Sequence, residues 1–128
     1  MKLKLNNLIK FSMKKLVNKI YLIGQKHVTF RIQYNFAGMG ATGNGVAGNS
    51  FDNVRMGIRA HIQHLKCYAS TEPLNNDRVD PRWSESLRGK ALYVEYLSIL
   101  NNPYGTGWAG DPNYAEKLLT MVNDIKAI

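Results

Sequence analysis

The chain has 128 residues, a formal net charge of +8 and one cysteine, Cys67. A chain of this length forms one domain that buries roughly two-thirds of its unfolded surface. The single cysteine excludes an internal disulfide, so packing must stabilise the fold. We interpret Cys67 as a half-buried helix residue and leave a lone nucleophile as the less favoured alternative.

The positive charge is confined to an N-terminal arm, residues 1–32. Residues 1–31 hold eight basic residues and no acidic one, whereas the rest of the chain holds nine of each. Such an arm is attracted to polyanions, or it is simply a solvated face. Because the body is neutral, we expect no nucleic-acid function. Lysines interrupt the apolar runs, so we predict neither a transmembrane segment nor a secretory signal.

The first half of the chain combines a helical pattern with an alternating one. Apolar spacing predicts a helix over about 7–23, and the alternation over 27–36 predicts a strand or one arm of a hairpin. A loop with five glycines follows at 38–49. Ser50 is then the expected N-cap of a helix that runs to about residue 68. Its apolar face would carry Phe51, Val54, Ile58, Ile62 and Leu65.

The second half is predicted to be helical with irregular connections. Turn signals mark residues 70–90, where we expect a short helix near Trp83–Leu87, since a structureless loop of about 20 residues would be unusual. Another helix is expected over about 91–100. Asp111 and Pro112 would supply the cap and first-turn proline of a last helix, to about residue 126. Its inner face would carry Tyr114, Leu118, Met121, Val122 and Ile125.

Two motifs indicate sites that we do not favour. Residues 43–48 match the GxGxxG pattern, but no buried strand precedes them, and Asn49 stands where a phosphate loop has lysine. Glycines that adopt positive backbone angles explain this loop better. His61 and His64 are three residues apart on a helix, yet no third metal ligand stands out, so hydrogen-bonded or solvent-facing histidines are favoured. We predict no cofactor and no metal.

Aromatic residues gather in or near the loops of the C-terminal half: Trp83, Tyr104, Trp108 and Tyr114. Aromatic rings stack on sugars, and Asn102, Asp111 and Asn113 offer partners for sugar hydroxyls. Many such rings instead fill a core, so the pattern alone supports either reading.

Five stretches of the chain form a recognisable combination of motifs. They are the Asn35-Phe36-Ala37-Gly38-Met39-Gly40 run continuing to residue 51, the helix at 54–66, Val79-Asp80-Pro81-Arg82, Tyr93-Val94-Glu95-Tyr96-Leu97, and residues 107–118. Together they resemble glycoside hydrolase family 73. The family comprises bacterial β-N-acetylglucosaminidases of autolysins and phage endolysins, often described as mannosyl-glycoprotein endo-β-N-acetylglucosaminidase-like. The resemblance covers about residues 33–125. It implies a lysozyme-like, mainly α domain (α+β, with a short β element) at 33–128, and peptidoglycan glycan strands as its substrate.

The resemblance also exposes a departure. Glycoside hydrolysis needs a carboxylic acid to protonate the leaving oxygen. The family's glutamate should fall near residue 19, but that residue is Lys19, and Asp52 is the first acidic residue of the chain. Three explanations remain, in this order: a truncated or rearranged copy that binds wall or is inert, a different acid such as Glu95 or Asp52, or a partner chain that supplies the missing part.

The predicted site follows from these readings. Tyr114 matches the cleft tyrosine of the family's Asp-Pro-Asn-Tyr motif, but it cannot act alone as the acid near neutral pH. The candidate catalytic residues are Tyr114, Glu95 and Asp52, and the candidate substrate-binding residues are Asn35, Trp108, Asp111, Asn113 and Tyr104.

The expected function is that of a peptidoglycan hydrolase-type domain, whose catalytic competence the missing glutamate leaves open. The alternative is a non-catalytic wall-binding module with a polyanion-binding arm, whose partner would be an anionic wall polymer. We expect the protein in the cell wall or outside the cell if it is exported, and in the cytoplasm until lysis if it is a phage-type lysin.

Overall fold

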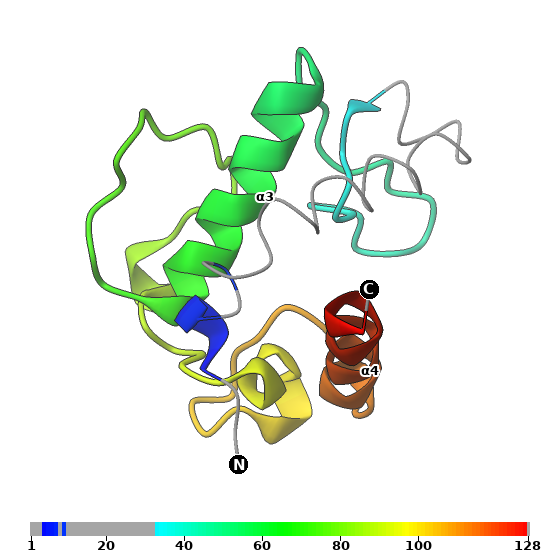
Figure 1. The fold of residues 1–128 in the computed structure, drawn as a ribbon. Helices are drawn as coiled ribbons and strands as arrows, with labels where there is room; N and C mark the ends of the chain where they lie inside the picture. Colours follow the sequence, from blue (N-terminus) through cyan, green and yellow to red (C-terminus); the bar gives the residue numbers. More distant parts are fainter. Residues whose placement is uncertain (1–3, 8, 10–32, 128) are drawn as a thin grey trace. The chain divides into compact units, whose positions relative to one another are not determined.

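The chain is mainly helical (Figure 1). The computed structural model describes residues 4–7, 9 and 33–127. The helix predicted at about 7–23 and most of the strand predicted at 27–36 lie outside these residues, and residues 33–36 are not in a strand. The chain divides into two compact units: unit 1 comprises residues 1–13, 65–73 and 84–128, and unit 2 comprises residues 14–64 and 74–83.

Helix α3, Val54–Ala69, confirms the helix predicted after the glycine loop. The predicted cap is wrong, because Asn53 and not Ser50 fills that role. The side-chain oxygen of Asn53 accepts a hydrogen bond from the backbone N–H of Met56 at 3.0 Å, which is the usual N-cap geometry. The helix therefore begins later than the apolar pattern indicated.

The buried face of α3 also differs from the one predicted. The five apolar residues expected to face the core are only half-buried. The buried positions are instead Gly57, Ala60, Gln63, His64, Cys67, Tyr68 and Ala69. The backbone comes closest at Gly57, where a Cβ atom would lie 1.9 Å from the carbonyl oxygen of Tyr34. Small and polar residues therefore occupy the buried positions of α3, where another segment of the same chain approaches the helix most closely.

The continuous helix predicted over about 91–100 is wrong. Two 3-10 turns, η2 (Val94–Leu97) and η3 (Ile99–Asn101), occupy this segment. The carbonyl of Leu97 accepts the N–H groups of Trp108 and Ala109 at 2.8 and 3.0 Å, and the N–H of Ile99 donates to Ala109 at 2.9 Å. An α-helix would use these groups for its own bonds. Pairing with residues 108–109 therefore replaces it.

Two further helices stand close to their predicted positions. The 3-10 turn η1, Glu85–Leu87, confirms the short helix expected near residues 83–87. Helix α4, Tyr114–Lys126, confirms the last helix, but its N-cap position is Asn113. Asp111 is not the cap, because its Oδ1 accepts the N–H of Asn113 at 2.9 Å in a turn before the helix. Pro112 consequently precedes the helix and does not lie in its first turn.

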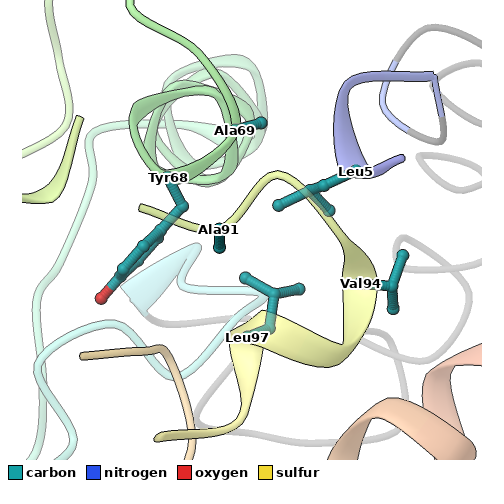
Figure 2. Close-up of a cluster of buried hydrophobic side chains, with 6 residues drawn as sticks. All are labelled: Leu5, Tyr68, Ala69, Ala91, Val94 and Leu97. Atoms are coloured by element: carbon teal, nitrogen blue, oxygen red, sulfur yellow. The ribbon is translucent and has the colours of Figure 1, made fainter. Parts of the chain in front are cut away.

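A hydrophobic cluster forms the core of unit 1 (Figure 2). Its buried members come from three parts of the chain: Leu5; Tyr68 and Ala69 at the end of α3; and Ala91, Val94 and Leu97. Leu5 is tied to this core by its N–H, which donates to the carbonyl of Leu92 at 2.9 Å. On α4, Val122 is buried as predicted, whereas Met121 is 44% exposed.

Helix α4 and η2 pack against each other. Tyr114, Leu118 and Leu119 of α4 lie against the hydrophobic cluster that includes Val94 and Leu97 of η2. The beginning of α4 and the η2 turn are therefore held in one packed body. This body positions most of the candidate site.

Candidate functional site

Six of the eight predicted site residues lie in unit 1: Glu95, Tyr104, Trp108, Asp111, Asn113 and Tyr114. The other two, Asn35 and Asp52, lie in unit 2. Unit 1 therefore gathers most of the predicted site around η2, the 102–111 segment and the start of α4.

Asp111 stands just before α4 and is held in place on several sides. Its carboxylate accepts a hydrogen bond from the exposed ammonium group of Lys117, its carbonyl accepts one from the hydroxyl of Ser98 at 3.1 Å, and its Oδ1 accepts the N–H of Asn113. The Lys117 hydrogen bond, with that of Asn113, lowers the pKa of the Asp111 carboxyl below its ordinary value. Asp111 is therefore an ionised acceptor near neutral pH. Such a group suits sugar hydroxyls and not proton donation.

Tyr114 opens α4, and its backbone N–H donates to the carbonyl of Asp111 at 3.1 Å. Its side chain is half-buried against the hydrophobic cluster. Burial raises the pKa of the Tyr114 phenol above its ordinary value, because the charged form is poorly solvated there. Tyr114 is therefore a neutral hydroxyl that can donate and accept hydrogen bonds.

Glu95 lies in η2, the turn that packs on α4. Its Oε2 atom is buried and has no hydrogen-bond partner among the described residues. A buried carboxylate oxygen without a partner is costly, and such groups often have a functional explanation. Among the acidic residues of unit 1, Glu72, Glu85, Glu116 and Asp124 are exposed. Asp111 is half-buried, but both of its carboxylate oxygens accept hydrogen bonds. Within the described residues, Glu95 is thus the acid of unit 1 with a buried oxygen that lacks a partner.

The two aromatic candidates differ in their surroundings. Trp108 is half-buried against the hydrophobic cluster, with its ring centroid 6.5 Å from that of Tyr68. Tyr104 is 61% exposed, and the ammonium of Lys90 lies 4.4 Å from its ring centroid. Sequence reasoning did not include Lys90 in the site. Nothing in the spacing links residues 90 and 104, so only the fold reveals this pair.

Asn35 is buried in unit 2, and its side chain bonds to backbone groups. Its Nδ2 donates to the carbonyls of Met39 and Asn49, each at 2.9 Å, and its Oδ1 accepts the N–H of Met39 at 2.9 Å. Asn35 therefore pins together the two ends of the glycine loop. Asp52 is exposed just before α3.

The tip of the glycine loop explains its sequence. The N–H of Val46 donates to the carbonyl of Gly43 at 3.0 Å, and the two central residues, Asn44 and Gly45, have φ angles of 51° and 81°. Two positive φ angles and this bond define a type I′ turn, for which Asn-Gly is the preferred pair. The glycines accordingly serve backbone geometry, as predicted. The whole segment from residue 41 to 47 is exposed.

A polar cluster lies where α3 meets residues 77–82 in unit 2. The Nδ1 atom of His64 is 2.8 Å from Asp80 Oδ2, and both residues are buried. Asp80 Oδ1 accepts the N–H of Arg82 at 2.8 Å. The hydrogen-bonded interpretation of His64 is therefore confirmed. No group of three or more metal-ligating side chains occurs among the residues that the structure describes.

The burial of two other residues of α3 bears on their predicted roles. His61 is half-buried, and burial, followed by the charge of His64, lowers its pKa from 6.5 to about 4. Cys67 is fully buried and not half-buried as predicted, and its thiol donates to the carbonyl of Ser84 at 3.3 Å.

Within the described part of the chain, no helix is long and apolar enough to cross a bilayer.

Comparison with known proteins gives one informative match. No family model and no solved structure matches the chain. The chain is 46% identical over 94 residues to an uncharacterised protein of Borreliella burgdorferi. The matched stretch covers 73% of this chain and 42% of that protein, so the chain spans less than half the length of this relative. Because the match covers 94 of the 128 residues, it includes about residues 35–94 wherever in the chain it begins. The glycine loop and α3 lie within these residues.

Proposed function

We propose that the chain is a peptidoglycan hydrolase-type domain, of the β-N-acetylglucosaminidase kind, that engages the glycan strand through unit 1. We define the α4 site as Glu95, Trp108, Asp111, Asn113 and Tyr114. The observation that carries the proposal is the buried Oε2 of Glu95, which has no hydrogen-bond partner within residues 4–7, 9 and 33–127, on a turn that packs against α4. The resemblance to glycoside hydrolase family 73 supplies the substrate class.

The residues of the α4 site offer complementary chemistry for a sugar. Asp111 is an ionised acceptor that is hydrogen-bonded to Lys117. Tyr114, three residues later, is a neutral phenol. In the proposed reaction Glu95 donates its proton to the glycosidic oxygen as the C–O bond breaks. Water then adds to the anomeric carbon and its proton returns to the Glu95 carboxylate. Tyr114 positions the sugar or the water and is not the acid.

The alternative function is a wall-binding module without catalysis. The observation that favours it is the absence of Asp and Glu from the first 51 residues, where the family's glutamate is expected. In this case the α4 site retains affinity for the glycan, and the basic arm at 1–32 adds affinity for an anionic wall polymer. Both functions place the protein at the cell wall, reached by export or after lysis.

Release of reducing ends from purified peptidoglycan separates the two functions. We expect the parent protein to release them and Glu95→Gln to lower the rate by at least about 100-fold, the size of a lost general acid. Tyr114→Phe should lower it by about tenfold, the effect of one lost hydrogen bond in the transition state. Glu85→Gln is the matched control, because the Glu85 side chain is 79% exposed and also lies in a 3-10 turn of unit 1.

The outcomes are distinct. Activity that survives Glu95→Gln but is lost in Asp52→Asn would move the acid to unit 2. No release by the parent, together with co-sedimentation with sacculi, would establish the binding module. Neither release nor co-sedimentation would reject both functions.

A further inference from the structure

We propose that Lys90 and Tyr104 form a subsite for an acidic amino sugar, a hexosamine bearing a free carboxylate. In peptidoglycan this is the muramic acid residue of a peptide-free glycan strand, whose lactyl carboxylate is not amidated. The inference rests on the proposed function, because it names the type of glycan that the same unit recognises.

The Tyr104 ring is displayed by a tight turn. The carbonyl of Asn102 accepts the N–H of Gly105 at 3.2 Å, with Pro103 and Tyr104 as the central residues. Proline fixes one backbone angle of the turn, and Gly105 has a φ of 66°. Tyr104 is nevertheless 61% exposed. A large ring is thus held toward solvent by an ordered backbone.

One buried side chain joins this turn to Lys90. The Asn102 amide donates to the carbonyls of Lys90 and Tyr96 at 2.9 and 2.8 Å, and its Oδ1 accepts the N–H of Tyr104 at 2.8 Å. Asn102 is only 7% exposed. It therefore fixes the backbones of Lys90 and Tyr104 relative to each other. Sequence reasoning gave Asn102 to sugar hydroxyls, but the structure uses its amide for the backbone.

The pair combines a ring face with a positive charge. Lys90 Nζ lies 4.4 Å from the Tyr104 ring centroid, within cation–π range. None of the ion pairs formed among the described residues involves Lys90. The ammonium group accordingly keeps its capacity for an anion. Its backbone is also anchored, since its N–H donates to the carbonyl of Leu87 at 3.1 Å.

This geometry selects for a sugar that carries a carboxylate. Because Lys90 Nζ lies over one face of the Tyr104 ring, the apolar face of a pyranose would stack on the opposite face. The long, flexible Lys90 side chain can then pair with an anionic substituent at the edge of the ring. A neutral sugar uses the ring alone. A free lactyl carboxylate uses both groups, because it projects from the edge of the sugar ring.

The test compares two glycans of equal length in calorimetric or NMR titrations with the full chain. One is a neutral N-acetylglucosamine tetramer, and the other alternates N-acetylglucosamine with muramic acid residues that have free carboxylates. We expect the acidic glycan to bind about fivefold more tightly at low salt, the size of one exposed ion pair. Lys90→Gln should remove this preference, because it lowers the affinity for the acidic glycan more than the affinity for the neutral one. Tyr104→Ala should weaken binding of both glycans.

Arg78→Gln is the matched control, since it removes one exposed positive charge from unit 2. The preference should survive this change. Equal binding of the two glycans by the parent, or equal loss of preference in Arg78→Gln and Lys90→Gln, would overturn the subsite while the proposed function stands. Binding of neither glycan by the parent would instead reject the proposed function. Thermal unfolding of each variant verifies that the fold is retained.

Discussion

The two units of the chain are stabilised in different ways. Unit 1 is built on an apolar cluster in which Leu5, Val94 and Leu97 are at most 1% exposed. In unit 2 the buried side chains include Asn35, Gln63, His64 and Asp80. Apolar burial tolerates small adjustments of its partners, whereas buried polar groups require each hydrogen bond to be made. The same chain therefore contains one region that depends on volume and one that depends on hydrogen-bond geometry.

Each unit contains one of the two tryptophans, Trp108 in unit 1 and Trp83 in unit 2. Replacing either by phenylalanine gives a chain whose fluorescence reports on one unit. Urea unfolding of these two reporter chains shows whether the units unfold together. The stability variants are made in these two reporter chains.

The largest effect is expected from Asp80→Ala in unit 2. It leaves the N–H of Arg82 and the Nδ1 of the buried His64 without their acceptor. Losing these two hydrogen bonds to a buried carboxylate, of which the one from His64 is buried and the one from Arg82 is partly buried, should lower the free energy of unfolding by about 4 kcal/mol. Urea titration followed by Trp83 fluorescence measures the loss. Asp77→Ala is the control, because its side chain is exposed, and a comparable loss there would remove the explanation.

Leu97→Ala tests the apolar core of unit 1. Removing a fully buried leucine side chain leaves a cavity and should lower the free energy of unfolding by about 3 kcal/mol. Trp108 fluorescence is the measurement. Leu100→Ala, at a leucine that is 68% exposed, should cost under about 0.5 kcal/mol. Equal losses in the two variants would contradict the assigned core.

Acidification should lower the free energy of unfolding of unit 2, which contains His61, by less than either core substitution does. The pKa of His61 is about 4 in the folded chain and 6.5 when unperturbed, so the unfolded chain binds the proton first. This stability is complete above pH 6.5 and is lost as the pH falls toward 4. The free energy of unfolding should drop by about 2 kcal/mol between pH 6.5 and 5. His61→Asn should flatten this part of the pH profile; an unchanged profile would reject the assignment.

The smallest effect concerns the start of α3. Asn53→Ala removes the acceptor for the N–H of Met56 and should lower the free energy of unfolding by about 1 kcal/mol. Ser50→Ala, at an exposed residue outside the helix, should change it by less than about 0.5 kcal/mol. Thermal unfolding followed by circular dichroism is sufficient. The reverse ranking would restore Ser50 as the cap.

Local sequence signals determined much of the helical framework. The spacing of apolar residues predicted α3 and α4, since a helix with one buried face repeats every 3.6 residues. The sequence also predicted positive backbone angles in the glycine loop, because few residues other than glycine adopt positive φ at low cost. These features depend on neighbouring residues alone. The resemblance to glycoside hydrolase family 73, from which the function is proposed, also came from the amino-acid sequence alone.

Tertiary structure decided what depends on distant partners. Local pattern predicted a helix over 91–100, but backbone bonds with residues 108–109 replaced it by two 3-10 turns. The burial of the Glu95 oxygen, without a hydrogen-bond partner in the part of the chain that the structure describes, and the pairing of Lys90 with Tyr104 likewise arise from segments brought together by folding. Periodicity records which face of a segment prefers burial. It does not record which other segment supplies the partner, and that partner decides the hydrogen bonds and charges of a site.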